Sequence, residues 1–403
     1  MKAKRSVPSS RYPHLAVAVC LHMSASAYAD NQSAPASNGQ TPQRAQAEDQ
    51  LVRRQLARPQ IEVAFVLDTT GSMGGLLEGA KQKIWSLASR IAMGRPTPRL
   101  RVGLVAYRDR GDEYVAKVYP MTENLDAVYE DLQRFEPAGG GDTPEHVGRG
   151  LGEAVKNLKW SDSRNVMKII FIVGDAPPQN YQDEWSYLTW TTRAKQKGIV
   201  VNTVQCGSDV TTRTSFLQIA KRGSGTFVSI DAAGGMIATR TPFDEEMASL
   251  NARISSMSLY AGRAPARRSA EGRALAMASM PSEAAADRIG YLAKEGSARG
   301  AGGLASASTV PLGVRDLLSD KKAIDEVADD ELPAELKNKT RAERKAHIQE
   351  LQAQRKQFEM RVIELSKQRD AWMKKNVSEK DDAFDAQVMK DIRERGVRYG
   401  IAY

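Results

Sequence analysis

Three oxygen-bearing side chains alternate directly after an apolar run near the start of the chain. The run covers residues 61–67, and Asp68, Thr70 and Ser72 follow it at every second position. A carboxylate and two hydroxyls on one tight turn are hard oxygen ligands, which suit a small hard cation such as Mg²⁺. Taken alone, the pattern is more typical of a turn or a helix start, because Asp, Thr and Ser are common caps.

Two further oxygen donors come later in the sequence. Thr143 lies in the glycine-rich segment 139–145, and Asp175 follows the apolar run 167–173. If the apolar runs are parallel strands, all these turns lie at the same edge of one sheet. Together they predict a site for a divalent cation, which we expect to be Mg²⁺, Mn²⁺ or Ca²⁺. The predicted ligands are Asp68, Thr70, Ser72, Thr143 and Asp175.

Such a site would leave the cation able to accept one ligand from outside the chain. Mg²⁺ prefers six oxygen ligands and keeps some of its waters. The three hydroxyls would bind directly or nearly so, and Asp68 and Asp175 would balance the charge, partly through water. Because few carboxylates would bind directly, the cation would stay electron-poor. A carboxylate from a partner protein is therefore the expected outside ligand.

Strand-like and helix-like patterns alternate between residues 59 and 231. Near-continuous apolar runs, such as residues 100–107 and 199–205, are separated by amphipathic stretches. This alternation predicts an α/β fold with a Rossmann-like, doubly wound, mostly parallel sheet that is buried on both faces. Ligands of such sheets bind at the carboxyl ends of the strands, which is where Asp68 lies.

These residues resemble the von Willebrand factor type A (VWA) domain and its metal-ion-dependent adhesion site (MIDAS). The Asp-x-Ser/Thr-x-Ser element matches at Asp68, Thr70 and Ser72, the distant threonine at Thr143 and the distant aspartate at Asp175. Thr70 stands where many members have Ser, and it keeps the hydroxyl. The resemblance covers residues 59–231 and implies a Rossmann-like sheet and protein binding through a divalent metal. The helical end of the chain also looks like extensions of exported bacterial members.

The first 29 residues are predicted to be a cleaved signal peptide. Basic residues precede the apolar stretch 15–21, and Ala27-Tyr28-Ala29 fits the A-x-A cleavage pattern. We therefore expect a periplasmic or secreted protein. The apolar stretch is too short to span a bilayer and no other stretch is long enough, so no transmembrane span is predicted. Residues 30–58, rich in Gln, Ala, Ser and Pro, are predicted to be a flexible lead-in.

The composition changes twice after the α/β region. Residues 232–330 are rich in Ala, Gly, Ser and Arg, and we expect a loose linker with partial helices. Residues 331–403 have apolar positions three and four apart, which predicts an α-helical tail. Two of the four heptad a sites are Arg355 and Arg369, which argues against a long dimeric coiled coil. The tail could fold onto a second short helix or onto the sheet domain, or it could mediate self-association.

Charge and composition exclude several classes of function. The formal net charge is +9, and it falls to +5 without the four basic residues of the predicted signal. This charge is spread along the sequence and only 6% of residues are aromatic, so no nucleic-acid partner is expected. His146 and His347 lie in different parts of the chain, which excludes a histidine-based zinc site. No nucleophile elbow or general base is evident, so we do not expect an enzyme.

The sequence therefore predicts an exported binding protein that uses a divalent cation to capture an acidic group of a partner protein. Two alternatives stay open. The helical tail could be the working part of a structural or assembly factor, in which the metal only stabilises the fold. Less favoured is a metal-dependent hydrolase, since Asp68 follows a strand as phosphotransferase nucleophiles do.

Overall fold

The structure, a computed structural model, describes most of the chain after residue 57. The described residues are 58–141, 143–230, 239–300, 302–305, 310, 313–320, 323–377 and 383–403. The predicted signal peptide and nearly all of the predicted lead-in lie outside this part. Within it, no helix combines the length and the apolar character that crossing a membrane requires.

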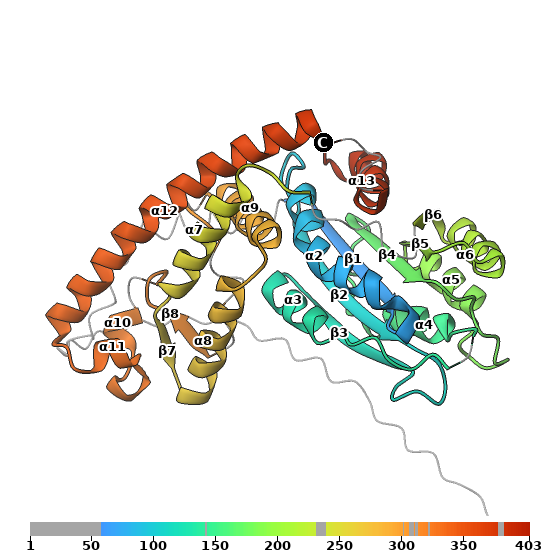
Figure 1. Cartoon of the computed structure of the whole chain (residues 1–403), viewed down its shortest axis with the longest axis horizontal. Helices are drawn as coiled ribbons and strands as arrows, with labels where there is room; N and C mark the ends of the chain where they lie inside the picture. The colour runs from blue at the N-terminus through green and yellow to red at the C-terminus, as the bar shows by residue number, and fades with distance from the viewer. Residues whose placement is uncertain are drawn as a thin grey trace, which may run out of the picture. The chain divides into compact units, whose positions relative to one another are not determined.

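Six strands form one sheet in the order β3–β2–β1–β4–β5–β6 (Figure 1). The edge strand β3 is antiparallel to β2, and the other five strands are parallel. The strands are β1 (Gln60–Asp68), β2 (Arg99–Tyr107), β3 (Ala116–Thr122), β4 (Val166–Gly174), β5 (Ile199–Cys206) and β6 (Ser224–Ile230). The predicted α/β fold with a mostly parallel, doubly wound sheet is confirmed.

The central strands are apolar along their length because helices cover both faces of the sheet. Val63 and Phe65 point to one face and Ala64 and Val66 to the other, as the alternation of a strand requires. The first face packs against α2 (Gly74–Ile91) and α3 (Leu125–Gln133). The second packs against α4 (Val147–Asn157), α5 (Tyr187–Gln196) and α6 (Val210–Arg222).

The region predicted to be a loose linker is instead largely helical and packed. It contains α7 (Asp244–Ser256), α8 (Ala264–Ala278), α9 (Ser282–Arg299) and the short antiparallel pair of β7 (Tyr260–Gly262) and β8 (Val314–Asp316). Ala284, Ala285 and Ala286 on α9 are almost fully buried. Small residues allow helices to approach closely, so a composition typical of a loose connector here belongs to tightly packed helices.

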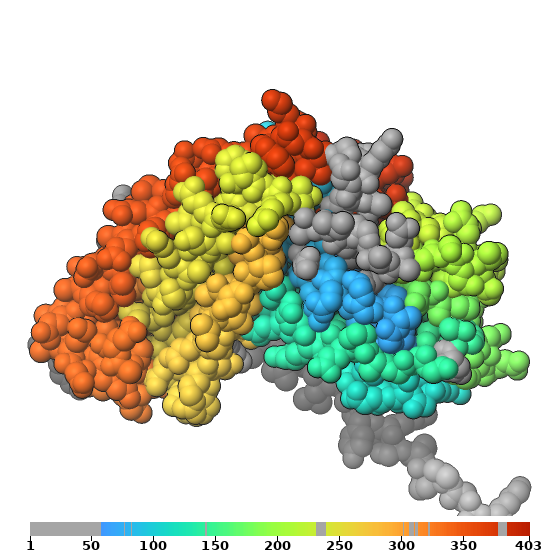
Figure 2. All heavy atoms as spheres, viewed as in Figure 1, coloured from blue at the N-terminus to red at the C-terminus, as the bar shows by residue number. Residues whose placement is uncertain are grey.

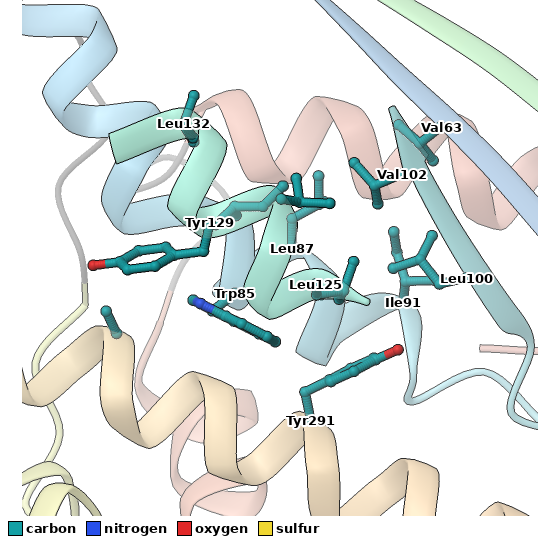
Figure 3. Close-up of a cluster of buried hydrophobic side chains, with 14 of the residues drawn as sticks. Val63, Trp85, Leu87, Ile91, Leu100, Val102, Leu125, Tyr129, Leu132 and Tyr291 are labelled. Atoms are coloured by element: carbon teal, nitrogen blue, oxygen red, sulfur yellow. The ribbon is translucent and has the colours of Figure 1, made fainter. Parts of the chain in front are cut away.

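Helix α9 joins these helices to the sheet domain through α2 and α3. The ring of Trp85 on α2 lies 5.9 Å from that of Tyr291 on α9 and 6.5 Å from that of Tyr129 on α3, between centroids (Figure 3). Atoms of α9 lie directly against the sheet domain in the space-filling view (Figure 2). The sheet and the later helices therefore share one hydrophobic core.

Helix α12 (Arg341–Asn376) is the long helix of the predicted tail, and short α10 (Ala323–Glu326) and α11 (Ala334–Lys337) precede it. The helical character of the C-terminal region is confirmed. The two heptad arginines are buried and paired within the chain. Arg355 donates to Asp316 at 3.0 Å, and Arg369 donates to Asp244 and Asp287 at 2.7 and 2.6 Å. These positions are thus used for intramolecular packing.

The final helix, α13 (Ala383–Gly396), belongs to the sheet domain and is not part of a separate tail. It packs beside α2 and β6. Val388 and Ile392 are fully buried in the core of the first face. After the 3₁₀ turn η3 (Val397–Tyr399), Ala402 pairs with Arg95 in an isolated antiparallel bridge. The α/β domain is therefore completed by residues about 150 positions beyond β6 in the sequence.

Candidate metal centre

The turn after β1 fixes the first three predicted ligands. Asp68 ends the strand and is fully buried. The backbone N–H and the hydroxyl of Thr70 donate to Asp68 Oδ1 at 2.9 and 2.7 Å. Thr70 Oγ1 and Ser72 Oγ are 3.4 Å apart. The structure therefore brings these three side chains together. Asp68 Oδ1 accepts both hydrogen bonds from Thr70, and Oδ2 accepts none from the residues that the structure describes.

The glycine-rich loop lies directly against this turn. The N–H of Gly71 donates to the carbonyl of Gly139 at 3.2 Å. Gly140 has φ +73°, and a Cβ there would lie 2.9 Å from Cβ of Thr70. Gly140 thus meets both a conformational and a steric requirement for glycine. Thr143 follows in the same loop with an exposed side chain, and the described contacts include no hydrogen bond from it to the other predicted ligands.

Asp175, the last predicted ligand, follows β4 at the same edge of the sheet. Asp68 Oδ2 and Asp175 Oδ1 are both buried and have no hydrogen-bond partner among the described residues. A buried carboxylate oxygen without a donor is costly, and a bound cation removes that cost. No group of three acidic, His or Cys side chains in the described part could hold a metal. The two unpartnered carboxylate oxygens and the nearby hydroxyls of Thr70 and Ser72 fit a hard cation.

Burial dominates the electrostatics of Asp68. Its pKa is raised to about 7, first because burial disfavours the charged form and further because of the negative charge of Asp175. The hydrogen bonds from Thr70 act in the opposite direction. A divalent cation would favour the ionised carboxylate and reverse the shift.

The sequence analysis missed Glu145 as part of this edge. Its side chain is buried, and its Oε2 has no partner among the described residues. Burial, followed by the charges of Asp68 and Asp109, raises its pKa to about 9. Thr-Pro-Glu at 143–145 is typical of a helix start, but α4 begins at Val147. Glu145 instead bridges to the loop after β4, where its N–H donates to the carbonyl of Pro177 at 3.0 Å.

Aromatic side chains pack around the acidic groups of the site. The ring of Tyr107 lies under the site, and a Cβ at Gly174 would come within 2.5 Å of its hydroxyl. The hydroxyl of Tyr181 donates to Asp109 Oδ2 at 2.6 Å. His146 is buried against the Tyr181 ring, and this burial lowers its pKa. No sequence pattern marks these supporting positions.

Comparison with known protein families agrees with this geometry. Residues 62–237 match the family model of the von Willebrand factor type A domain. This part of the chain is a VWA domain. The match begins within β1 and continues past β6, so it contains nearly all of the sheet but not α13. The contribution of α13 to the domain is visible only in the structure.

Individual relatives of the VWA domain are distant. A protein of Acanthamoeba polyphaga mimivirus described as an ariadne-like RING finger protein is 25% identical over 120 residues, which cover 30% of this chain and 11% of the viral protein. Proximal thread matrix protein 1 from the mussel byssus is 14% identical, with a TM-score of 0.34 and 43% of each chain covered.

Two more solved structures have similarly low sequence identity and TM-scores. Another structure of the mussel protein, with a zinc-occupied MIDAS motif, is 15% identical at a TM-score of 0.33 and covers 43% of this chain and 42% of its own. The VWA domain of SpRpn10 is 16% identical at a TM-score of 0.34 and covers 45% of this chain and 95% of its own. The present chain thus spans less than half of the viral and mussel proteins.

Proposed function

We propose that the chain is an exported binding protein whose VWA domain holds a divalent cation and uses it to capture a carboxylate of a partner protein. Mg²⁺ is the ion that the all-oxygen donor set suits best, and Mn²⁺ or Ca²⁺ would be accepted by the same ligands. The proposed ligands are Asp68, Thr70, Ser72, Thr143 and Asp175.

The observation that carries this proposal is the contrast between the buried part of the site, its floor, and the solvent-exposed part, its mouth. At the floor, the buried oxygens Asp68 Oδ2 and Asp175 Oδ1 lack hydrogen-bond donors in the described structure. At the mouth, Ser72 and Thr143 are exposed. The buried carboxylates would balance the charge of a cation bound between these two parts. The same cation would be accessible from solvent beside the exposed hydroxyls. This arrangement supports binding of an outside oxygen ligand.

We propose binding rather than catalysis. A hydrolase would need a base within reach of a water on the cation. His146, the histidine near the site, accepts a hydrogen bond from the N–H of Arg149 through Nδ1 at 3.3 Å and is buried. It therefore caps a helix, and the arrangement supports no role for it as a base toward solvent.

Calorimetric titration of the full chain with MgCl₂ and MnCl₂ tests the cation site. We expect one site per chain in the wild type and none in Asp68→Ala. Glu184→Ala is the matched control, because Glu184 is an exposed acid near the same edge and should leave binding unchanged. Equal binding by wild type and Asp68→Ala would refute the site.

The alternative in which the helical tail is the working part needs a different test from deletion of residues 331–403. That deletion would remove Val388 and Ile392 from the core of the α/β domain. A surface change on α12 is cleaner, and Met360, which is 55% exposed, offers one. Loss of partner binding or of self-association in Met360→Glu, with metal binding retained, would favour the assembly role.

A further inference from the structure

The amino ends of the parallel strands lie opposite the candidate metal centre, and this edge of the sheet is strongly basic. Exposed Lys and Arg side chains precede three neighbouring parallel strands, β4, β5 and β6. We call them the basic edge: Lys159, Arg164, Lys195, Lys197, Lys221 and Arg222. None of them takes part in an ion pair among the described residues. One exposed acid, Asp162, accompanies them.

Helix stability explains only part of this charge. Lys195, Lys221 and Arg222 lie in the last turns of α5 and α6, where a cation interacts favourably with the helix dipole. Lys159 and Arg164 lie outside helices, in the loop before β4. Elsewhere in the chain, buried and half-buried cations are mostly paired with acids, as Arg288 is with Asp126. At this edge, by contrast, six exposed cations without an ion pair in the described part of the chain precede three neighbouring strands.

An exposed apolar corner continues the basic edge. Met93, Val397 and Tyr403 are 45%, 73% and 41% exposed. Tyr403 packs against Gly94, and its hydroxyl donates to the carbonyl of Ile91 at 3.1 Å. The corner connects to β6 because Arg395 donates to the carbonyl of Ser224 at 2.6 Å. Exposed Arg95 and Arg398 lie within it.

We propose that the basic edge and the apolar corner together bind the surface of an anionic phospholipid bilayer. Cations are attracted to the negative headgroups, and apolar side chains among them enter the headgroup region. A nucleic-acid site would instead line a groove with cations and stacking aromatics. Here the cations spread over the ends of three strands and adjoin apolar side chains, which favours a lipid surface.

This surface would leave the metal centre free. Asp68 lies at the carboxyl end of β1, whereas Lys195 precedes the amino end of β5, which runs parallel to β1 through β4. The two surfaces are therefore at opposite edges of the sheet. A chain bound to a membrane through the basic edge would present the candidate metal centre away from the lipid.

Co-sedimentation of the full chain with vesicles tests the proposal. The vesicles contain equal parts of phosphatidylglycerol and phosphatidylcholine, or phosphatidylcholine alone, with EDTA present throughout. We expect Lys159→Glu, Lys195→Glu and Lys221→Glu together to lower partitioning onto anionic vesicles by about 100-fold. The control carries the same charge change at Lys337, Lys339 and Lys356, in α11, in α12 and between them, and should bind within a few-fold of wild type. Salt should weaken wild-type binding.

The phosphatidylcholine vesicles measure any insertion of the N-terminal apolar stretch, which all variants share. A second variant, Val397→Ser with Tyr403→Ser, should reduce the binding that remains at high salt. Equal binding of the two triple variants, or equal binding to neutral and anionic vesicles, would overturn the proposal. Binding to duplex DNA through the same three lysines, without binding to vesicles, would overturn it in favour of a nucleic-acid surface.

Discussion

Arg288 on α9 donates two hydrogen bonds, of 2.7 and 2.9 Å, to the carboxylate of Asp126 on α3. Both side chains are buried, and the Arg288 guanidinium also donates to Asn251 on α7 at 2.6 Å. The pair connects the VWA domain to the later helices. Breaking one member leaves a buried charge without its partner, which costs far more than the pair contributes as a whole.

We therefore expect Arg288→Met to lower the free energy of unfolding by about 3–5 kcal/mol. The double variant Asp126→Leu with Arg288→Met should recover much of that loss, because no buried charge remains. Urea denaturation of the full chain, followed by circular dichroism, measures both. A loss below about 0.5 kcal/mol in the single variant, the usual effect of a surface substitution, would show that the two parts are not coupled through this pair.

Helix α13 offers a second test of domain architecture. Ile392 is fully buried against the sheet domain, so Ile392→Ala should cost about 2–5 kcal/mol. Val397, five residues further along the chain and 73% exposed, supplies the control, and Val397→Ala should change stability by less than about 0.5 kcal/mol. Thermal unfolding of the two variants separates them. Similar melting temperatures would mean that α13 is not part of the folded domain.

The glycine loop provides a steric test of the metal centre. Gly140→Ala would push a Cβ to within 2.9 Å of Cβ of Thr70, and we expect Mg²⁺ affinity to fall by at least about tenfold. Gly111→Ala is the matched control, since Gly111 also has positive φ but has no atom near the added Cβ. Both variants therefore place an alanine at positive φ, but only the Cβ added at Gly140 would contact a predicted ligand, Thr70. Equal Mg²⁺ affinity in the two variants would show that the loop does not position Thr70.

The raised pKa of Asp68 gives cation binding a defined pH dependence. Below about pH 7 the folded state holds a proton on this carboxylate that the cation must displace. Apparent Mg²⁺ affinity should rise by up to about tenfold per pH unit between pH 5 and 7 and level off above it. Glu145, whose pKa is raised to about 9, could extend the rise, and Glu145→Gln isolates its contribution. Affinity that is flat from pH 5 to 7 would contradict the assignment of Asp68.

Without the cation, the same shift acts on stability with the opposite sign. The pKa of Asp68 is higher in the folded chain than its ordinary value of 3.8, so the folded state binds more protons between about pH 4 and 7. The free energy of unfolding should therefore fall as pH rises through this window, by at most about 1.4 kcal/mol per pH unit for this group. Mg²⁺ should remove that decline, and thermal unfolding with EDTA or Mg²⁺ measures the difference. An identical decline in both conditions would exclude the proposed coupling.

The sequence was sufficient to predict the sheet. Fully buried strands are continuously apolar, so residues 61–67 indicated β1 within one residue at each end. Only partial helices were expected after the sheet, because half of the buried residues of α9 are alanine or glycine, a composition that resembles a low-complexity connector. Likewise, the partners of Arg369 lie 82 and 125 residues away, and no local pattern reveals such pairs.

Glu145 was missed, and the surface on which α13 packs was left open, for a different reason. An acid in Thr-Pro-Glu is typical of a first helical turn, and only the bridge to Pro178 shows that Glu145 belongs to the acidic edge. The position of α13 depends on tertiary contacts such as that between Asn202 Nδ2 and Asp391 Oδ2, 3.1 Å apart and 189 residues apart in sequence. Periodicity predicts a helix of this kind but not the surface on which it packs.

Affinity capture from an envelope extract, with the full chain as bait, tests the central claim most directly. The bait is wild type with Mg²⁺, wild type with EDTA, or Asp68→Ala with Mg²⁺. We expect a partner protein retained only by wild type with Mg²⁺, and released by adding free acidic peptide that competes for the cation. The same partner retained in all three conditions would contradict capture through the metal and would place recognition elsewhere on the chain.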